Sequence, residues 1–555
     1  MNIKEKLCGV IGVISRPYVA IPALGALSLG LSFLLELIGL RHKFELGPVG
    51  LSPLTVTVGA LFIFAAALTL VYARGEKFDP KSKRQIALFA IVLLACTLIC
   101  TASLKNAGAE IKYPLSEKDL AVQNIFVKQF DAFEKGQLHL DLWVDPRLER
   151  MENPYDTDER ARQKIIYQWD HAYFEGRYYS YFGLAPLFLV YYPYYYITGA
   201  LPDTILVCAI LAIGATVALG LALRELVIFI HAKPPIWLFL FALPAAAFGI
   251  GIFGAQSYSD FYYVPVLSAM LSNCLFFFVA LRGNRAESRV AEATLFGGAA
   301  LAFVFSVMSR PTAALICLSL SPVIFRKFFL DKVSLPHRLA RILPFGAIAL
   351  AGAAFIMWFN YARFGSPLDF GANYQLTVND ISENTIELSL LPAALFHYLF
   401  QPMTVIERFP FVGPSLIELD YGRYVYVEKT IGIFHFPAVL GLIVCPFFYR
   451  IRERIVSFRR RDNTRALVFA FGAALALFLA FADFCKAGVN MRYLFDMLPI
   501  GVLLGTATLL RFAGDAEEGH SSHRSLFALA CFVGTVIVGM SIVVENYWDL
   551  LFAIA

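Results

Sequence analysis

The sequence predicts an all-α polytopic membrane protein with about 13 transmembrane helices. Of its 555 residues, 58% are hydrophobic and 16% are charged, and the mean hydropathy is +0.64. A soluble domain usually carries about 25% charged residues. The apolar residues form runs of about 18–22, which match a bilayer core of roughly 30 Å. The net charge of +5 does not indicate nucleic-acid binding, because the excess lies in short loops between apolar runs.

Thirteen apolar segments have the length and composition of membrane spans. They lie at 19–40, 54–73, 87–104, 203–223, 235–254, 262–282, 291–309, 312–326, 342–361, 432–449, 465–484, 493–511 and 525–545. Two long polar loops, 105–202 and 362–431, interrupt the series. This division predicts an N-terminal hairpin and loop (1–86), a transmembrane module with the first long loop (87–361), the second loop (362–431) and C-terminal helices (432–555).

The positions of lysine and arginine predict the orientation, since cytoplasmic loops are enriched in both. Clusters lie at 74–84, 282–289, 326–341 and 450–465. Placing all four in the cytoplasm puts the amino terminus inside and both long loops on the outer face. We therefore expect a multi-pass membrane protein with both long loops outside the cytoplasm.

The segment 180–200 is apolar enough to resemble a further span. Counting it as a crossing would place the cluster at 282–289 outside, against the charge rule. Its tyrosines at 191, 192 and 194–196 have rings that favour headgroup depth. We therefore predict a helix that lies in the membrane surface.

A second irregularity is Arg310-Pro311, which divides the apolar stretch 291–326. Proline removes a helical hydrogen bond, and an arginine at the centre of a span is costly in lipid. We predict two crossings, with Arg310 at the outer surface between them.

The first long loop is rich in carboxylates and aromatic residues, a composition typical of carbohydrate-handling sites. Carboxylates accept hydrogen bonds from hydroxyls and act as general bases, and flat rings pack against sugar C–H surfaces. Most loop aspartates, however, are solvated or cap helices, and Asp156 suits an N-cap for a helix at 157–168. The loop aspartates are Asp131, Asp141, Asp145, Asp156, Asp158 and Asp170.

Several short motifs resemble membrane glycosyltransferases of the GT-C superfamily, of the dolichyl-phosphate-mannose protein mannosyltransferase and rhizobial lipopolysaccharide-core transferase types. The resemblance covers roughly 87–510, and the segment 19–73 looks like an added hairpin. Its motifs are Asn153-Pro154-Tyr155-Asp156, Trp169-Asp170, Gly176-Arg177-Tyr178-Tyr179 through Gly183 and Pro186, Asn360 through Pro367, Phe370-Gly371, Tyr374-Gln375-Leu376-Thr377 and Arg492-Tyr493.

The resemblance implies an enzyme that takes a sugar from a polyprenyl-phosphate donor in the outer leaflet. The implied acceptor is a lipid-linked molecule, a polysaccharide or a protein, and the implied base is a first-loop carboxylate. The sequence departs from the pattern where many members carry an aspartate, because the corresponding position lies near Asn124. Asp131, Asp156 or Asp170 then has the role, and we place Asp170 first and Asp156 second.

Arg310 and Arg492 are predicted to bind the donor phosphate, since each lies at a helix end and a guanidinium binds phosphate through two hydrogen bonds. The alternative for each is contact with lipid headgroups. The substrate contacts that we predict are Tyr155, Arg177, Tyr179, Asp260, Tyr374 and Gln375. Asp260 also suits a helix cap.

The sequence contains no motif that identifies a cofactor. The histidines are scattered and no HExxH motif is present, although carboxylates alone can hold a divalent ion. Two other classes stay open: a transporter or flippase of lipid-linked sugars, which would place ionisable residues in mid-membrane, and a non-enzymatic envelope-assembly protein. The scarcity of charge within the predicted spans favours the enzyme.

Overall fold

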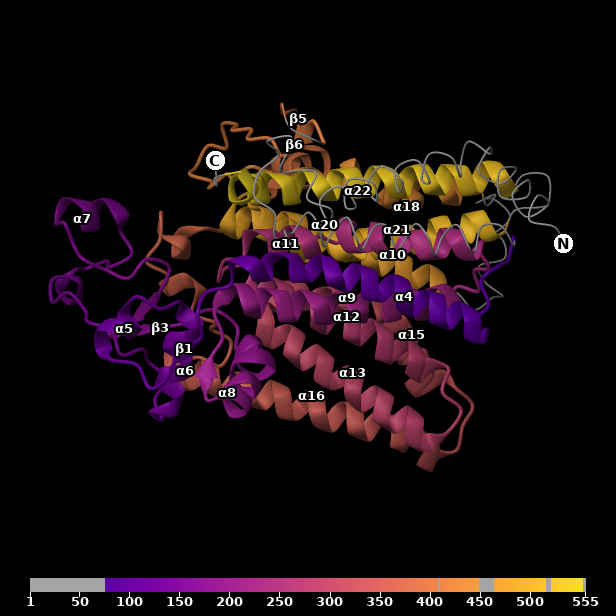
Figure 1. Cartoon of the computed structure of the whole chain (residues 1–555). Helices are drawn as coiled ribbons and strands as arrows, with labels where there is room; N and C mark the ends of the chain where they lie inside the picture. The colour runs from indigo at the N-terminus through magenta and orange to yellow at the C-terminus, as the bar shows by residue number, and fades with distance from the viewer. Residues whose placement is uncertain (1–74, 408–409, 449–463, 516–520, 553–555) are drawn as a thin grey trace, which may run out of the picture.

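The protein is described by a computed structural model that covers residues 75–407, 410–448, 464–515 and 521–552. Long helices lie side by side along one direction, and the elements of the loops gather at one end of this bundle (Figure 1). Within the described residues, ten helical segments are long and apolar enough to cross a membrane. The chain is therefore an all-α polytopic membrane protein.

The ten segments follow the predicted spans closely. They are Lys83–Cys100 (α4), Thr204–Phe229 (α9), Ile236–Tyr258 (α10, Ile236–Gly249, and α11, Ile252–Tyr258), Val264–Asn284 (α12), Arg289–Ser309 (α13), Pro311–Leu330 (including α14, Pro311–Ala314, and α15, Ser321–Phe325), Leu335–Phe364 (α16), Thr464–Ala487 (α20), Met491–Gly514 (α21) and His523–Asn546, within α22 (Ser521–Phe552).

Three of the 13 predicted spans are not among these ten segments. The segment predicted at 432–449 contains α18, Pro437–Phe448, which has 12 residues. The segments 19–40 and 54–73 lie outside the described residues. The structure thus supports the fold class and the ten spans, whereas the count of 13 stays a prediction.

The segment 180–200 does not form a membrane-spanning helix. A π-helical turn at Leu187–Tyr191 continues into α8, Tyr192–Thr198. Gly199, at a φ of 75°, caps α8 in the left-handed conformation that favours glycine. These 12 residues reach about 18 Å at the helical rise, less than a bilayer core of roughly 30 Å. Their position in the membrane surface stays a prediction.

The break at Arg310-Pro311 falls where the sequence predicts it. Helix α13 ends at Ser309, and Arg310 is extended, with φ −151° and ψ 108°. The residue before a proline is disfavoured in helical geometry, while proline itself suits the first turn of the next helix. Pro311 accordingly begins α14.

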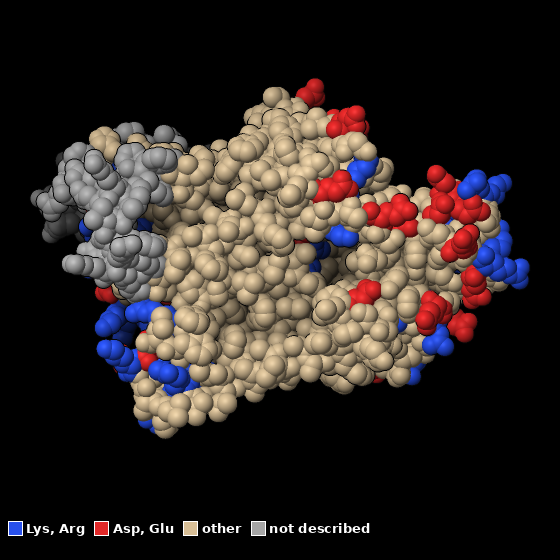
Figure 2. All heavy atoms as spheres, turned by 180° about the vertical axis from the view of Figure 1, so that it is seen from behind, with Lys and Arg blue, Asp and Glu red and all other residues tan. Residues whose placement is uncertain are grey.

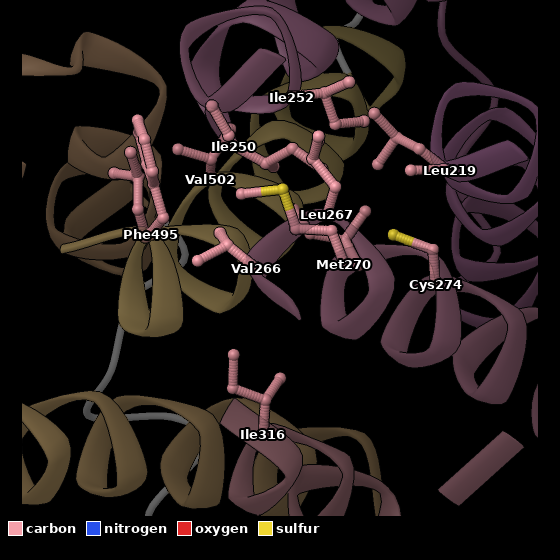
Figure 3. Packing of buried hydrophobic residues seen from close by; sticks show 14 of the residues in the cluster. Leu219, Ile250, Ile252, Val266, Leu267, Met270, Cys274, Ile316, Phe495 and Val502 are labelled. Carbon is pink, nitrogen blue, oxygen red and sulfur yellow. The ribbon is translucent and has the colours of Figure 1, made fainter. Parts of the chain in front are cut away.

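Apolar side chains fill the interior of the bundle. Figure 3 shows Leu219 of α9 and Leu267 and Met270 of α12 facing Ile252 of α11 and Phe495 of α21. All five are buried. The residues of the candidate active site, described below, lie outside this apolar packing, at the end of the bundle that carries the loops.

The first long loop consists of short elements and turns. They are β1 (Ile111–Lys112), α5 (Glu117–Ala121), α6 (Ile125–Glu134), α7 (Thr157–Arg162), β2 (Ala172–Phe174), β3 (Arg177–Tyr179) and β4 (Ala200–Leu201), with β1 antiparallel to β4 and β2 antiparallel to β3. The helix predicted at 157–168 is wrong beyond Arg162, because Lys164 adopts a φ of 52°, which a helix does not allow.

The second long loop carries less regular structure. Its elements are α17 (Leu391–Leu395) and the antiparallel pair β5 (Thr404–Val405) and β6 (Val412–Gly413). Figure 2 shows charged side chains at the two ends of the molecule, with a broad band between them that is nearly free of Lys, Arg, Asp and Glu. That band is the surface that a hydrocarbon core tolerates.

Candidate active site

A short β-hairpin and the second loop together fix the backbone at Asp170. The turn between β2 and β3, Glu175-Gly176, has two positive φ angles, 46° and 75°, as tight hairpin turns require. Before β2, the N–H of Asp170 donates to the Leu376 carbonyl, and the N–H of Leu376 donates to the His171 carbonyl, each at 3.0 Å. Asp170 has a φ of 52°, a region that aspartate enters more readily than most residues.

The Asp170 carboxylate lies against the turn between α11 and α12. Its Oδ2 accepts a hydrogen bond from the hydroxyl of Tyr262. The guanidinium of Arg492, the second residue of α21, lies 4.4 Å from the centroid of the Tyr262 ring, a cation–π contact. The Nε of Arg492 donates to Asn490 Oδ1 at 3.2 Å. Within the described part of the chain, Arg492 forms no salt bridge.

A polar cavity of about 360 Å³ opens beside these groups. Three carboxylates and three cations line it, together with hydroxyl and amide groups. The lining residues that matter here are Asp170, Asp260, Glu428, Arg423, Lys486, Arg492, Tyr181, Tyr262, Tyr424 and Gln375. Donors and acceptors that converge on one hollow are the recognition elements that a ligand rich in hydroxyl groups needs.

The three cations in the polar cavity differ in their described partners. Arg423 forms a salt bridge with Glu387 at 3.1 Å and donates to the Cys485 carbonyl at 2.6 Å. The Nζ of Lys486 donates to the Asn384 carbonyl. Among the described residues, Lys486 and Arg492 thus contact neutral groups only, and of these two cations Arg492 alone lines both cavities.

Burial shifts the pKa of two groups that line the polar cavity. It raises the pKa of Asp260 above its ordinary value, although hydrogen bonds from the N–H groups of Phe261 and Tyr262 act in the opposite direction. Burial and the neighbouring Asp170 carboxylate also raise the pKa of Tyr181. Asp260 therefore keeps its proton more readily than an exposed aspartate does.

A second cavity, of about 320 Å³, adjoins the first and is mainly apolar. Tyr181, Arg492 and Tyr493 line both cavities. The apolar walls come from the ends of α12, α13 and α16 and from the first loop, and they include Phe182, Leu184, Pro265, Met308, Ile356 and Phe359. Gly183 permits the close approach of the first loop to α13, because a Cβ at residue 183 would collide with the Met308 carbonyl.

The outer face of α16 is the most exposed surface among the described spans. Only 6% of the most apolar 18-residue stretch of α16 is buried inside the protein. Large apolar residues project from it, including Leu343, Leu350, Phe355, Trp358 and Tyr361. A helix of this composition faces lipid when the protein is in a membrane, and Ile356 and Phe359 of the same helix line the apolar cavity.

Arg310 lies in the wall of the apolar cavity, but its charge is already compensated. Its Nε donates to Asp496 Oδ1 at 2.7 Å, and its Nη2 donates to Asp496 Oδ2 at 2.6 Å. The side chain is 15% exposed and that of Asp496 is 1% exposed. Arg310 is thus buried within the protein and paired with a carboxylate of α21, while its position at the outer surface of the membrane stays a prediction.

The other two aspartates that we considered as bases lie outside both cavities. Asp131, on α6, is buried, pairs with Lys135 at 2.9 Å and accepts from the Tyr113 hydroxyl at 3.3 Å. Asp156 accepts from the N–H of Glu159 at 2.9 Å and is the N-cap of α7. The capping interpretation of Asp156 is confirmed.

The predicted substrate contacts lie in three different places. Asp260 and Gln375 line the polar cavity. Tyr155, Tyr179 and Tyr374 belong instead to an aromatic cluster with Phe174 and Phe364, in which the ring centroids of Phe174 and Tyr374 are 4.7 Å apart. Arg177 is exposed on β3 and lines neither cavity.

Three residues that we did not select are central to this arrangement. Tyr262 binds Asp170, Arg363 lines the apolar cavity, and Asp496 neutralises Arg310. Asp483 of α20 is also buried, with no hydrogen-bond partner for its Oδ2. The sequence contains a signal for the two aspartates, since an ionisable residue inside an apolar span indicates a functional or paired position.

No cluster of three or more His, Cys, Asp or Glu residues suited to a metal ion occurs within the described ranges. Asp170 and Asp260 both line the polar cavity, and their oxygens are the kind of ligand that Mg²⁺ and Ca²⁺ prefer.

No protein-family model and no curated protein match this sequence. Among solved structures, the chain is similar to the oligosaccharyltransferase of Archaeoglobus fulgidus in its apo form, at 13% sequence identity and a TM-score of 0.41. The match covers 84% of this chain and 56% of that one, so the chain spans about half the length of the oligosaccharyltransferase.

Proposed function

We propose that this chain is a GT-C-type membrane glycosyltransferase. It transfers a sugar from polyprenyl phosphate to a lipid-linked, polysaccharide or protein acceptor. The observation that carries the proposal is the position of Arg492 between the two cavities. A cation without a described carboxylate partner stands where a polar, carboxylate-bearing cavity meets a mainly apolar one.

This pair of cavities suits an amphipathic donor in three parts. The prenyl chain lies along α16 and in the apolar cavity, the phosphate contacts Arg492, and the sugar occupies the polar cavity. Guanidinium groups form short, charge-assisted hydrogen bonds with phosphate oxygens. A soluble sugar donor has no use for the apolar cavity, so the lipid-linked donor explains more of the site.

The chemistry that we propose uses Asp170 as the general base. Asp170 takes the proton of an acceptor hydroxyl, and the hydroxyl oxygen attacks the anomeric carbon. The bond from that carbon to the phosphate oxygen breaks, and its electron pair stays on the phosphate. The hydrogen bond from Tyr262 orients the Asp170 carboxylate, and Asp260 positions the acceptor. General-base catalysis contributes about 10²–10⁴-fold to such a step.

A transporter of lipid-linked sugars fits the described residues less well. Transport requires a polar passage near the middle of the membrane. Apolar side chains make up most of the interior around α9, α11, α12 and α21 (Figure 3), and the buried Ser268 and Asn273 of α12 hydrogen-bond to Ser309 and Ser306 of α13. The buried charges Arg310 and Asp496 neutralise each other and so do not provide such a passage.

The location that we propose is the bacterial inner membrane, with the loops on the outer face. Cysteine placed at Thr157 or Ser382 should react with a membrane-impermeant thiol reagent in intact cells, whereas cysteine at Ser457 should not. Labelling at 457 from outside would contradict the orientation inferred from the charge distribution.

The direct test of function uses purified protein in membranes with a labelled sugar on polyprenyl phosphate. We expect label to move from the donor to a glycan, lipid or protein fraction of the source membranes. Loss of transfer in the Asp170→Asn variant, at unchanged protein level, would assign the activity to this site. Protein that moves intact donor between leaflets without cleaving it would support the transporter instead, and absence of both activities would support an assembly role.

A further inference from the structure

Arg363, near the end of α16, has a guanidinium that contacts neutral groups. Its Nη1 donates to the Ser180 carbonyl at 2.6 Å, its Nη2 to Asn360 Oδ1 at 3.0 Å, and its Nε to the Phe359 carbonyl at 3.3 Å. The guanidinium carbon lies 3.8 Å from the ring centroid of Phe359 and 4.6 Å from that of Phe364. The residue is 5% exposed. These bonds fix the orientation of the group without neutralising it.

The positive charge of Arg363 has no described counterion at contact distance. Within the described ranges it forms no salt bridge, and Asp369 in the following turn uses its Oδ1 to accept from the N–H of Gly371 at 2.8 Å. The three hydrogen bonds engage three of the five N–H groups of a guanidinium. Removing an unpaired charge from water is costly, so an anion that arrives with a ligand would relieve this cost.

Arg363 and Arg492 line the same apolar cavity. Arg310, the third arginine in that wall, is neutralised by Asp496. The cavity wall therefore presents two uncompensated guanidinium groups from two different helices, α16 and α21. One negative charge would balance only one of them.

We propose that Arg363 and Arg492 together bind the phosphate of the departing lipid carrier, and bind it more tightly than the phosphate of the donor. This inference rests on the proposed function. In the donor, the phosphate links a prenyl group to a sugar and carries one negative charge. When the bond to the anomeric carbon breaks, its electron pair remains on the phosphate oxygen and the acceptor oxygen bonds to that carbon. The product is a prenyl phosphate monoester, whose charge approaches −2 above a second pKa of about 6.

This pairing gives Arg363 a role in the transition state. A second guanidinium gains most of its interaction as the extra charge develops, and an interaction that is stronger in the transition state than in the ground state raises kcat. Replacing Arg363 should therefore lower kcat more than it raises KM for the donor. The released monoester should compete with the donor as a product inhibitor.

Binding can be measured without any transfer reaction. The probes are farnesyl phosphate, a monoester, and farnesyl methyl phosphate, a diester, added to the full-length protein in nanodiscs at a pH well above 6. We expect the unchanged protein to bind the monoester about ten- to hundredfold more tightly, the range that one charge-assisted contact provides. Arg363→Gln should bring the two affinities close to equality, and Arg363→Lys should restore part of the preference.

Arg160→Gln is the matched control. Arg160 is 1% exposed, donates to the carbonyls of Pro154 and Thr377 at 2.8 Å each, and lies 4.6 Å from the ring centroid of Tyr167. It lines neither cavity, so its loss removes a buried guanidinium without changing the proposed phosphate site. This variant should lose stability but keep the preference for the monoester.

The outcomes separate this inference from the proposed function. Equal affinity for the two lipids in the unchanged protein, or a full preference in Arg363→Gln, overturns the role of Arg363 even where sugar transfer is observed. The protein could also prefer the monoester through Arg363 and yet transfer no sugar. That result would support the two-arginine phosphate site and would contradict the proposed enzyme activity. An equal loss of preference in Arg160→Gln would assign the effect to general destabilisation and would also overturn the proposal.

Discussion

Two regions of the molecule contain an arginine beside the same cavity, but their charges are arranged differently. At the break between α13 and α14, Arg310 is locked to Asp496 by hydrogen bonds of 2.6–3.0 Å. At the start of α21, Arg492 contacts the Tyr262 ring and Asn490 and faces both cavities. In the first region the protein satisfies its own charge, and in the second it leaves a charge for a ligand.

The same contrast separates the loop aspartates. Asp131 pairs with Lys135 and Asp156 caps α7, whereas Asp170 borders a cavity with a tyrosine hydroxyl as its hydrogen-bond partner. Substitutions at internally satisfied charges should reduce stability first. Substitutions at charges that face a cavity should reduce activity first. The four predictions below test this distinction.

The largest expected effect is on transfer, at Asp170. Asp170→Asn preserves the size of the side chain and an oxygen for the Tyr262 hydroxyl, but it removes the group that accepts a proton. We expect sugar transfer from polyprenyl phosphate to fall by about 10²–10⁴-fold. Since the residue lies in a loop away from the packed core, the stability should change by less than about 0.5 kcal/mol.

Asp156→Asn and Asp131→Asn are the controls for Asp170. Asparagine caps helices about as well as aspartate, so Asp156→Asn should retain nearly full transfer. Asp131→Asn should act mainly on protein level, through the lost ion pair with Lys135. Full activity of all three variants would remove first-loop carboxylates from the mechanism, and loss confined to Asp156→Asn would exchange the assigned roles.

The second prediction concerns stability at the break between α13 and α14. Asp496→Asn leaves Arg310 as an unpaired charge inside the bundle, which costs about 3–5 kcal/mol. We expect a clear loss of folded protein and a lower temperature of thermal aggregation in detergent. The double variant Arg310→Gln with Asp496→Asn should recover much of this loss, because no isolated charge remains. A single variant as stable as the unchanged protein would show that the pair is dispensable.

The third prediction compares the two arginines directly. Arg492→Gln removes a phosphate contact and should raise the donor KM or lower kcat/KM by about 10–100-fold, equivalent to about 1.5–3 kcal/mol. Its thermal stability should stay close to that of the unchanged protein. Arg310→Gln should show the reverse pattern, with a larger loss of stability than of kcat/KM in the folded fraction. Identical profiles for the two variants would contradict the contrast between the regions.

The last prediction is a pH dependence of stability at His171, next to Asp170. Burial lowers the pKa of His171 to about 4, so the folded state keeps it neutral while the unfolded chain protonates it below about 6.5. The unfolded state therefore binds more protons between these values, and stability falls as the pH drops from about 6.5 to about 4, by up to about 3 kcal/mol. His171→Gln should flatten a thermal-unfolding profile over this window, and an unchanged slope would assign the pH dependence elsewhere.

The sequence by itself determined the membrane class, the position of the described spans and the exclusion of 180–200 as a span. These features are local, because the length and hydropathy of a segment decide whether it can cross a bilayer. It also selected Asp170, Asp260, Gln375 and Arg492, four residues that border one cavity. Only the tertiary structure decided which charges are satisfied internally. Asp496 lies 186 residues from Arg310 in the sequence, and Tyr262 lies 92 from Asp170. A charge is neutralised by whichever group packs beside it, and that neighbour depends on how the helices are arranged in space.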